Sequence, residues 1–271
     1  MSTDSKRKEK AVVYKQQQIA TGIYDMWIET SIAKDAKAGQ FISVYPKDGA
    51  TLLPRPISIC EADKENGRLR IVYRVAGKGT DEFSKYEAGE TVSVLGTLGN
   101  GFPVEKAKGK SVFLMGGGIG IPPMLQLAKE LAHANRYADE ADKIKIQIIV
   151  GYRDNQMFLL AELQKYGAVY VATEDGSVGT KGNVMDAIKA NNLQADLIFS
   201  CGPMPMLRAI KAYGEAENVE AYISLEERMA CGVGACLGCV VKTKEVDHHS
   251  HVHNARICTD GPVYLAEEVE I

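Results

Sequence analysis

Four of the six cysteines in this 271-residue chain are spaced so that they could hold a metal cluster. Four residues separate Cys231 from Cys236, two separate Cys236 from Cys239, and eighteen separate Cys239 from Cys258. This C-x4-C-x2-C run with a distant fourth thiolate is the plant-type ligand arrangement of a [2Fe–2S] cluster. The spacing therefore predicts a one-electron carrier, with iron held by these four thiolates.

Glycines interrupt the same stretch at Gly232, Gly234 and Gly238. A loop wrapped around a cluster must aim backbone N–H groups at sulfur and often needs positive φ, which glycine adopts at low cost. A structural zinc site is the alternative, although such sites usually show two C-x2-C pairs and only one is present. Disulfides are not expected, because the charged stretch at residues 1–10 predicts no signal peptide and six cysteines suit a reducing compartment.

Composition limits the partners. The chain has 32 Lys and Arg against 35 Asp and Glu, a net charge of −3. Nucleic acid as the main partner would need a clear basic excess. Gly or Pro residues interrupt the long apolar stretches of the sequence, so no membrane span is expected. These features predict a cytoplasmic protein in which Cys60, outside the cluster, is a buried small thiol.

Four of the five histidines lie between Cys239 and Cys258, at His248, His249, His251 and His253. Closely spaced histidines can bind metal. A solvated loop on an insertion is the favoured interpretation, because nothing nearby supplies supporting hydrogen bonds. His133, within a helical pattern among polar neighbours, is expected at the surface.

The elements that must position these residues fall into three domains. Residues 1–107 carry short strand patterns such as "QFISVYP" and "LRIVYRV" and no long helical period, which predicts an antiparallel barrel or sandwich after a charged tail. Residues 108–219 alternate strands with helices, which predicts a parallel sheet covered on both faces. Residues 220–271 hold the cysteines and form a small domain that a metal would stabilise. The fold class is multidomain β plus α/β.

In the second domain, the strands are expected at 111–116, 145–152, 168–175 and 195–203. The helices are expected at 122–141, 155–167, 183–192 and 204–218.

"GGGIGIPPM", at 116–124, follows a strand and opens a helix, where main-chain N–H groups could receive a diphosphate. It is not the G-x-G-x-x-G fingerprint, and a tight turn without a ligand is the alternative. "CGP" at 201–203 ends another strand and should face the same ligand. Glu174 and Asp175 would suit a free ribose hydroxyl and favour NAD over NADP, although they could form only a solvated turn.

"LLPRPISI" places Arg55 and Ser58 where a guanidinium could bind a diphosphate and a hydroxyl could reach a flavin ring nitrogen. "YRVAGKGT" offers a second phosphate cradle around Tyr73, Arg74 and the 77–80 loop. Each of these stretches could equally be a plain strand and turn.

Taken together, "RPIS", "GGGIGIPPM" and "CGPMPM" resemble the ferredoxin–NADP reductase superfamily, over nearly the whole chain after the charged tail. "LEERMACGVGACLGC" is similar to the iron–sulfur electron-transfer subunits of type B dihydroorotate dehydrogenases. "AGQFISVYP", "LGNGFP" and "EDGSVGTKG" resemble the same subfamily.

The resemblance implies an oxidoreductase subunit that serves pyrimidine biosynthesis. Electrons would pass from a dihydroorotate-oxidising catalytic subunit with FMN, through the [2Fe–2S] cluster and FAD, to NAD⁺. The complex would be a heterotetramer with two copies of each subunit. Two features depart from the pattern: Ile57 is aliphatic where the superfamily often has an aromatic residue, and the histidine insertion lengthens the loop before Cys258.

The resemblance also assigns residues. Those expected to contact FAD are Arg55, Pro56, Ile57, Ser58, Val72, Tyr73, Arg74, Gly77, Gly79 and Thr80. Those expected at the nicotinamide nucleotide are Gly117, Gly118, Gly120, Gly202 and Pro203, with Cys201 as the catalytic candidate near nicotinamide and flavin.

Two alternatives remain open. The same cofactors would serve a subunit of a sulfide dehydrogenase, a hydrogenase or a ferredoxin-linked transhydrogenase. A zinc-stabilised nucleotide-binding regulator without redox turnover is the alternative from another class, and it would be colourless.

Overall fold

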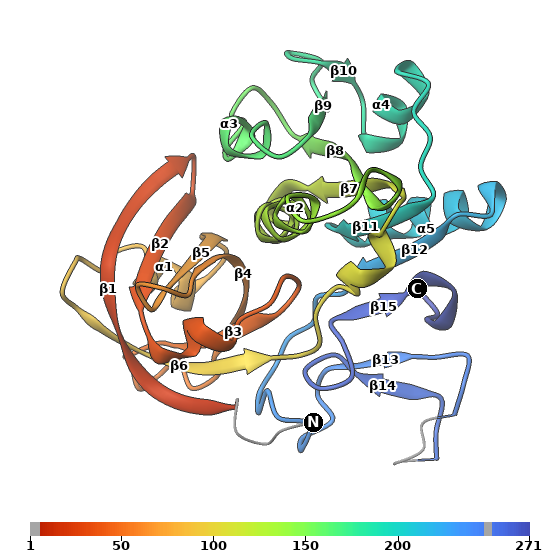
Figure 1. The fold of residues 1–271 in the computed structure, drawn as a ribbon. Coiled ribbons are helices and arrows are strands. Elements are labelled where there is room, and N and C mark those ends of the chain that lie inside the picture. The colour runs from red at the N-terminus through yellow and green to blue at the C-terminus, as the bar shows by residue number, and fades with distance from the viewer. Residues whose placement is uncertain (1–5, 247–250) are drawn as a thin grey trace.

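A computed structural model describes residues 6–246 and 251–271. It confirms the expected fold class, with a closed barrel, a mainly parallel sheet and a carboxyl-terminal cysteine segment (Figure 1). In these two ranges, no helix is long and apolar enough to cross a membrane.

The barrel contains six antiparallel strands in the order β1-β2-β5-β4-β3-β6. Their bounds are β1 Arg7–Ala20, β2 Ile23–Glu29, β3 Phe41–Tyr45, β4 Arg55–Asp63, β5 Arg68–Arg74 and β6 Thr91–Leu98. One short helix that the sequence did not predict, α1 (Lys78–Phe83), follows β5. At six residues it is too short to show a helical period.

The side chains of β5 alternate between two environments, as expected for a strand. Leu69, Ile71 and Tyr73 pack in the barrel core. Val72 packs instead in the apolar cluster beneath the sheet, and Arg70, on the same face, meets Glu162 of that part of the chain. The outer face of β5 therefore forms part of the contact between barrel and sheet.

The second sheet has seven strands in the order β10-β9-β8-β7-β11-β12-β15, all parallel except β15. Their bounds are β7 Ser111–Gly117, β8 Lys145–Tyr152, β9 Ala168–Thr173, β10 Thr180–Lys181, β11 Leu197–Cys201, β12 Glu220–Ser224 and β15 Val263–Leu265. The near-continuous apolar runs of β7, β8 and β11 are typical of strands that are buried on both faces.

Four helices pack on this sheet: α2 (Pro122–Asn135), α3 (Leu160–Leu163), α4 (Val184–Ala190) and α5 (Met204–Glu217). Apolar residues of α2 and α3 share one core cluster, and those of α4 and α5 share another. Helices therefore cover both faces, as predicted.

Two helices, α2 and α3, are much shorter than predicted. The helix expected to reach residue 141 ends at Asn135, whose side-chain amide bonds both N–H and C=O of Ile144 at 2.8 and 2.9 Å. The helix expected at 155–167 is reduced to Leu160–Leu163, because Leu159 takes a left-handed φ of 64° just before it. Single-turn 3₁₀ segments lie at Ser31–Asp35, Val104–Ala107, Gly118–Gly120, Glu140–Asp142 and Ala266–Glu268.

The cysteine segment is joined to both other parts of the chain. It carries the hairpin β13 (Val240–Lys242) and β14 (Asn254–Arg256), while β12 and β15 extend the parallel sheet beyond residue 219. Asn100, just after the barrel, donates to the carbonyls of Asp260 and Val263 at 3.0 and 2.8 Å.

Candidate functional site

A crevice of 530 Å³ lies between the barrel and the carboxyl ends of the parallel strands. It brings together four of the residues expected to bind a cofactor: Arg74 from the barrel, and Gly117, Gly118 and Pro203 from the sheet. Ligands of open α/β sheets bind beyond these strand ends. The crevice is therefore the candidate nucleotide site.

The glycine turn is shaped by close contacts. A Cβ on Gly117 would lie 2.5 Å from Met206 Sδ, and one on Gly120 would lie 2.3 Å from the Cys201 carbonyl oxygen. Gly118 has φ +53° and open space around it. Gly120 thus lets the turn pack on the end of β11, and Gly118 leaves its main chain accessible to a diphosphate.

Cys201 lies at the strand end, paired with Gly116 and Ser224, but its side chain is 0% exposed. It is not among the residues that line the crevice. Burial raises the pKa of this thiol, and the nearby Glu226 raises it further. Cys201 is therefore a neutral, buried thiol behind the crevice, a setting that does not suit a thiolate nucleophile.

The two acidic residues that were expected at a ribose differ in their surroundings. Glu174 lines the crevice. Asp175 instead accepts the N–H of Ser177 at 2.9 Å, which holds a turn. Hydrogen bonds from the Ser177 side chain and from this N–H lower the pKa of the Asp175 carboxyl. Only Glu174 remains a candidate for a ribose hydroxyl.

Arg55 and Gly79, both expected at FAD, lie together. A Cβ on Gly79 would stand 2.9 Å from Arg55 Nε, so the guanidinium packs where only glycine leaves room. Thr80 Oγ1 accepts the N–H groups of Ala76 and Gly77 at 2.9 and 3.2 Å, which fixes the turn beside it. A cation over a glycine-containing turn fits a diphosphate.

Two other FAD candidates point elsewhere. Ile57 is 8% exposed and packs in the barrel core. Tyr73 is 2% exposed and its hydroxyl donates to Gln16 Oε1 at 2.7 Å inside the barrel. Both side chains stabilise the barrel, which leaves their main chain for a flavin. Pro56 and Ser58 are half-buried on the same strand as Arg55.

The four cluster cysteines form two pairs. In the first pair, the N–H groups of Val233 and Cys236 each donate to Cys231 Sγ at 3.4 Å. Partial burial opposes ionisation, but these N–H groups lower the pKa of Cys231 to about 6. The loop thus stabilises a thiolate at Cys231, as a metal ligand requires.

The second pair is buried. Cys239 is 2% and Cys258 0% exposed, and the Ile257 N–H donates to the Cys239 carbonyl at 2.8 Å. Burial, together with Cys239, raises the pKa of Cys258 to about 12. Within residues 6–246 and 251–271, no three His, Cys, Asp or Glu side chains converge as ligands of one ion would. A [2Fe–2S] cluster takes two ligands on each iron, so a donor set in two pairs fits it.

Histidines do not join this set in the part of the chain that is described. His253 Nδ1 lies 3.0 Å from the Lys244 carbonyl in the hairpin, and His248 and His249 fall outside the described residues. His133 is exposed on α2 and Cys60 is buried, both as expected.

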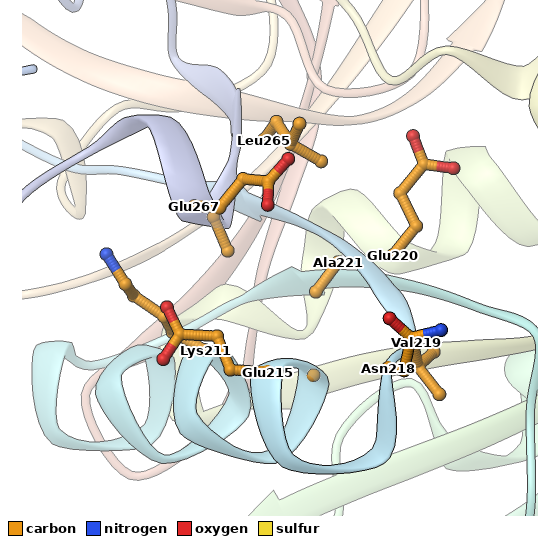
Figure 2. A pocket seen from close by; sticks show the side chains of 10 residues that line it. Lys211, Glu215, Asn218, Val219, Glu220, Ala221, Leu265 and Glu267 are labelled. Carbon is orange, nitrogen blue, oxygen red and sulfur yellow. The ribbon is translucent and has the colours of Figure 1, made fainter. Parts of the chain in front are cut away.

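A second hollow, of 410 Å³, lies between α5 and the β12–β15 edge (Figure 2). Glu215, Glu220 and Glu267 line it, and the one lysine there, Lys211, donates to the Val269 carbonyl. None of the residues expected to bind a cofactor lies in it. The crevice beside Arg74 therefore remains the nucleotide candidate.

Several residues that line the crevice or join the barrel to the sheet were not predicted from the sequence. Tyr152 and Met206 line the crevice but belong to ordinary strand and helix patterns. Arg70 is 6% exposed and bonds three carboxylates, those of Asp25, Glu61 and Glu162. Its charge within the apolar run "LRIVYRV" was a usable signal, because such a charge is rarely buried without a partner.

The barrel followed by a parallel sheet is the fold of the ferredoxin–NADP reductases. A ferredoxin NADP⁺ reductase from Neisseria gonorrhoeae with bound FAD and NADP superposes with a TM-score of 0.61, 17% identity, and coverage of 74% of this chain and 87% of that one. An NADH-dependent reduced ferredoxin–NADP oxidoreductase, studied for flavin-based electron bifurcation, reaches a TM-score of 0.82 at 26% identity, covering 96% and 89%.

Two family models match: an oxidoreductase NAD-binding domain over residues 114–212, and the iron–sulfur cluster binding domain of dihydroorotate dehydrogenase B over 226–270. Two relatives are named dihydroorotate dehydrogenase B (NAD(+)), electron transfer subunit. The one from Fusobacterium nucleatum is 43% identical, with 97% of this chain and 98% of the relative covered. The one from Listeria welshimeri is 40% identical, with 96% and 97% covered. The chain belongs to this family of electron transfer subunits.

Proposed function

We propose that this chain is an oxidoreductase subunit that passes electrons from a dihydroorotate-oxidising partner to NAD⁺, in pyrimidine biosynthesis. One observation carries the proposal. The barrel meets the nucleotide crevice at Arg74 on β5, and its strands β3 and β6 meet the cysteine loop, where a Cβ on Gly232 would lie 3.1 Å from Leu98 and 3.4 Å from Ser43. The barrel therefore adjoins both the nucleotide crevice and the cysteine loop.

The ligand assignments are part of the proposal. Iron is held by Cys231, Cys236, Cys239 and Cys258. FAD lies along Arg55, Pro56, Ile57, Ser58, Val72, Tyr73, Arg74, Gly77, Gly79 and Thr80, and NAD at Gly117, Gly118, Gly120, Gly202 and Pro203. When bound, nicotinamide exchanges hydride, the cluster exchanges single electrons, and the flavin can do both.

The chain's own residues hold and separate these groups. Arg55 neutralises the charge of the flavin diphosphate beside Gly79. Arg74 reaches the crevice from the barrel, opposite the glycine turn. Cys201 lies behind that turn and shapes it through its carbonyl contact with Gly120. We therefore assign Cys201 a packing contribution near nicotinamide and flavin.

The partner would be a catalytic subunit with FMN, two copies of each subunit forming the complex. The exposed side of the cysteine loop supports the position of this contact. Cys236 is exposed, and Val233, Leu237 and Val240 around it are 45%, 58% and 40% exposed. Apolar side chains gathered on a surface loop are typical of an interaction site. We place the partner there.

Two further assignments complete the proposal. Three functional units at 1–107, 108–219 and 220–271 bind FAD, NAD and the cluster, with the last unit sharing β12 and β15 with the sheet. A cytoplasmic location suits a chain whose six cysteines form no disulfide.

The test is dihydroorotate-dependent NAD⁺ reduction, without oxygen, by the chain co-expressed with its candidate FMN subunit. NADH should appear only when both subunits are present. If the chain is coloured and NADH bleaches its flavin, but dihydroorotate gives no response, the cofactor assignment stands and the partner assignment is wrong. A colourless chain would reject the cofactors too.

The cysteine assignment has its own variant pair. Cys236→Ser should remove iron and abolish transfer from the partner, while NADH still reduces the flavin. Cys60→Ala removes a buried thiol outside the loop and should retain the iron. Equal iron contents in the two variants would contradict the ligand set.

A further inference from the structure

Ser43 has a buried hydroxyl with no partner. Its residue is 0% exposed, and Oγ is among the few buried side-chain polar atoms of the described chain that lack a hydrogen bond. A buried polar group in that state is costly, and its persistence calls for a ligand or a redox role.

The strand directs this hydroxyl outward from the barrel. On β3, Ile42 and Val44 pack in the barrel core, whereas Phe41 and Tyr45 pack with the cluster that includes Cys239 and Cys258. Because side chains alternate along a strand, Ser43 faces the cysteine segment with Phe41 and Tyr45.

The cysteine loop passes directly over it. A Cβ on Gly232 would lie 3.4 Å from Ser43 Oγ, and Gly232 has φ +69°, a conformation that favours glycine. Gly232 follows Cys231, the cysteine whose sulfur already accepts two backbone N–H groups. The hydroxyl therefore lies against the residue that follows Cys231, on the barrel side of the loop.

The same residue also adjoins the flavin strand. Ser43 pairs with Pro56 across the β3–β4 ladder, one residue from Arg55. Ser43 thus lies between the loop proposed to hold the cluster and the strand proposed to hold FAD.

We propose that the Ser43 hydroxyl donates a hydrogen bond to a sulfur on the Cys231 side of the cluster and so raises its reduction potential. The inference rests on the proposed function, because it requires the cluster. A donor to sulfur stabilises the more negative, reduced state, and hydrogen bonds to sulfur are among the factors that set such potentials. Ser43 thus tunes the reduction potential of the cluster from the side of the loop that faces the proposed flavin strand.

The experiment is an EPR-monitored redox titration of the cluster in the purified, reconstituted chain. Ser43→Ala should reduce the equilibrium constant for cluster reduction about tenfold, which is a shift of ~59 mV to lower potential for one electron. Ser43→Thr and Ser43→Val form a pair of nearly equal volume that differs in the hydroxyl. The valine variant should shift and the threonine variant should remain near wild type.

Ser200→Ala is the matched control, because it removes a buried hydroxyl that already has a protein partner, donating to the Tyr222 carbonyl at 3.2 Å. Its cluster potential should equal that of wild type. Unchanged potentials in Ser43→Ala, or equal potentials in the valine and threonine variants, would overturn the inference and leave the cluster assignment intact. A wild-type chain that shows no [2Fe–2S] EPR signal would overturn the proposed function itself.

Discussion

Arg70 on β5 and Glu162 in α3 join the barrel to the nucleotide-binding sheet by two hydrogen bonds, of 2.6 and 2.9 Å. The same guanidinium bonds Asp25 of β2 at 2.9 and 2.8 Å. The buried Arg70 guanidinium therefore bonds a carboxylate on each side of the contact between the barrel and the sheet. Bidentate pairing on both sides offsets the cost of removing its charge from water.

Replacing Arg70 with Met should destabilise the chain by about 3–5 kcal/mol, because Asp25, at 3% exposure, would keep a buried charge without its partner. Urea unfolding measures the loss. Arg68→Ala is the control on the same strand: its pair with Glu29 is half-exposed and screened by water, so its loss should change the free energy of unfolding little. Equal losses in the two variants would contradict the role given to Arg70.

The Glu162 contact should depend on pH. The hydrogen bonds from Arg70 lower the pKa of this carboxyl below its ordinary value of 4.5. A lowered folded-state pKa contributes stability that is complete above the unfolded value and is lost as pH falls through the folded value. The stability difference between wild type and Glu162→Gln should be full at pH 7 and smaller at about pH 3, below the ordinary value of this carboxyl. Urea midpoints at both pH values check this, and a difference that grows in acid would be inconsistent with it.

Arg55→Ala should weaken FAD binding by about ten- to a hundredfold, since a charge-assisted hydrogen bond contributes about 1.5–3 kcal/mol. Gly79→Ala should weaken it in the same direction, because the new methyl would press on the Arg55 guanidinium from 2.9 Å. Flavin fluorescence on titration with FAD gives the dissociation constants. Arg68→Ala, which removes a barrel arginine away from Gly79, should bind FAD like wild type; a matching loss there would indicate a general charge effect.

Gly120→Ala should cost about 1–3 kcal/mol of stability and raise the KM for NADH severalfold, because a Cβ would lie 2.3 Å from the Cys201 carbonyl and backbone surrounds it. Steady-state reduction of an artificial acceptor by NADH, with a thermal melt, measures both effects. Gly49→Ala meets nothing within 4 Å and should change neither. A wild-type KM in Gly120→Ala would show that the turn does not shape the nucleotide site.

Leu237→Asn should weaken association with the catalytic subunit at least about tenfold, as expected for a central apolar contact of more than 1 kcal/mol. Asparagine tolerates the φ of 54° at this position, so the backbone should be retained. Tyr137→Asn removes an exposed aromatic residue (80%) beyond the end of α2 and serves as control. Biolayer interferometry gives the affinities, with iron content verifying that the loop still holds its cluster. Wild-type affinity in Leu237→Asn would place the partner elsewhere.

The sequence predicted the elements whose patterning is local. Strands β7, β8 and β11 are buried apolar runs, and the residue types in them are enough to distinguish them from helices in the sequence. It did not predict the end of α2 at Asn135 or the short α3, since the first depends on a contact with Ile144 and the second on the left-handed Leu159.

The candidate site divides in the same way. Cys231, Cys236 and Cys239 are close in sequence, and the structure puts them in one loop. Arg70 and Ser43 escaped prediction because their significance comes from Glu162 and Gly232, which lie 92 and 189 residues further along the chain. Ile57 and Tyr73 were assigned to FAD by motif, but strand alternation sends their side chains into the barrel.

The antiparallel pairing of β15 with β12 limits how the chain can be divided. A fragment that stops at residue 219 would leave β11 as a bare, apolar sheet margin, and one that stops before Val263 would do the same to β12. Uncovered margins of this kind invite pairing with other chains. A flavin-and-nucleotide fragment free of the cluster would therefore have to be made by deleting the loop between β12 and β15 internally, with both strands retained.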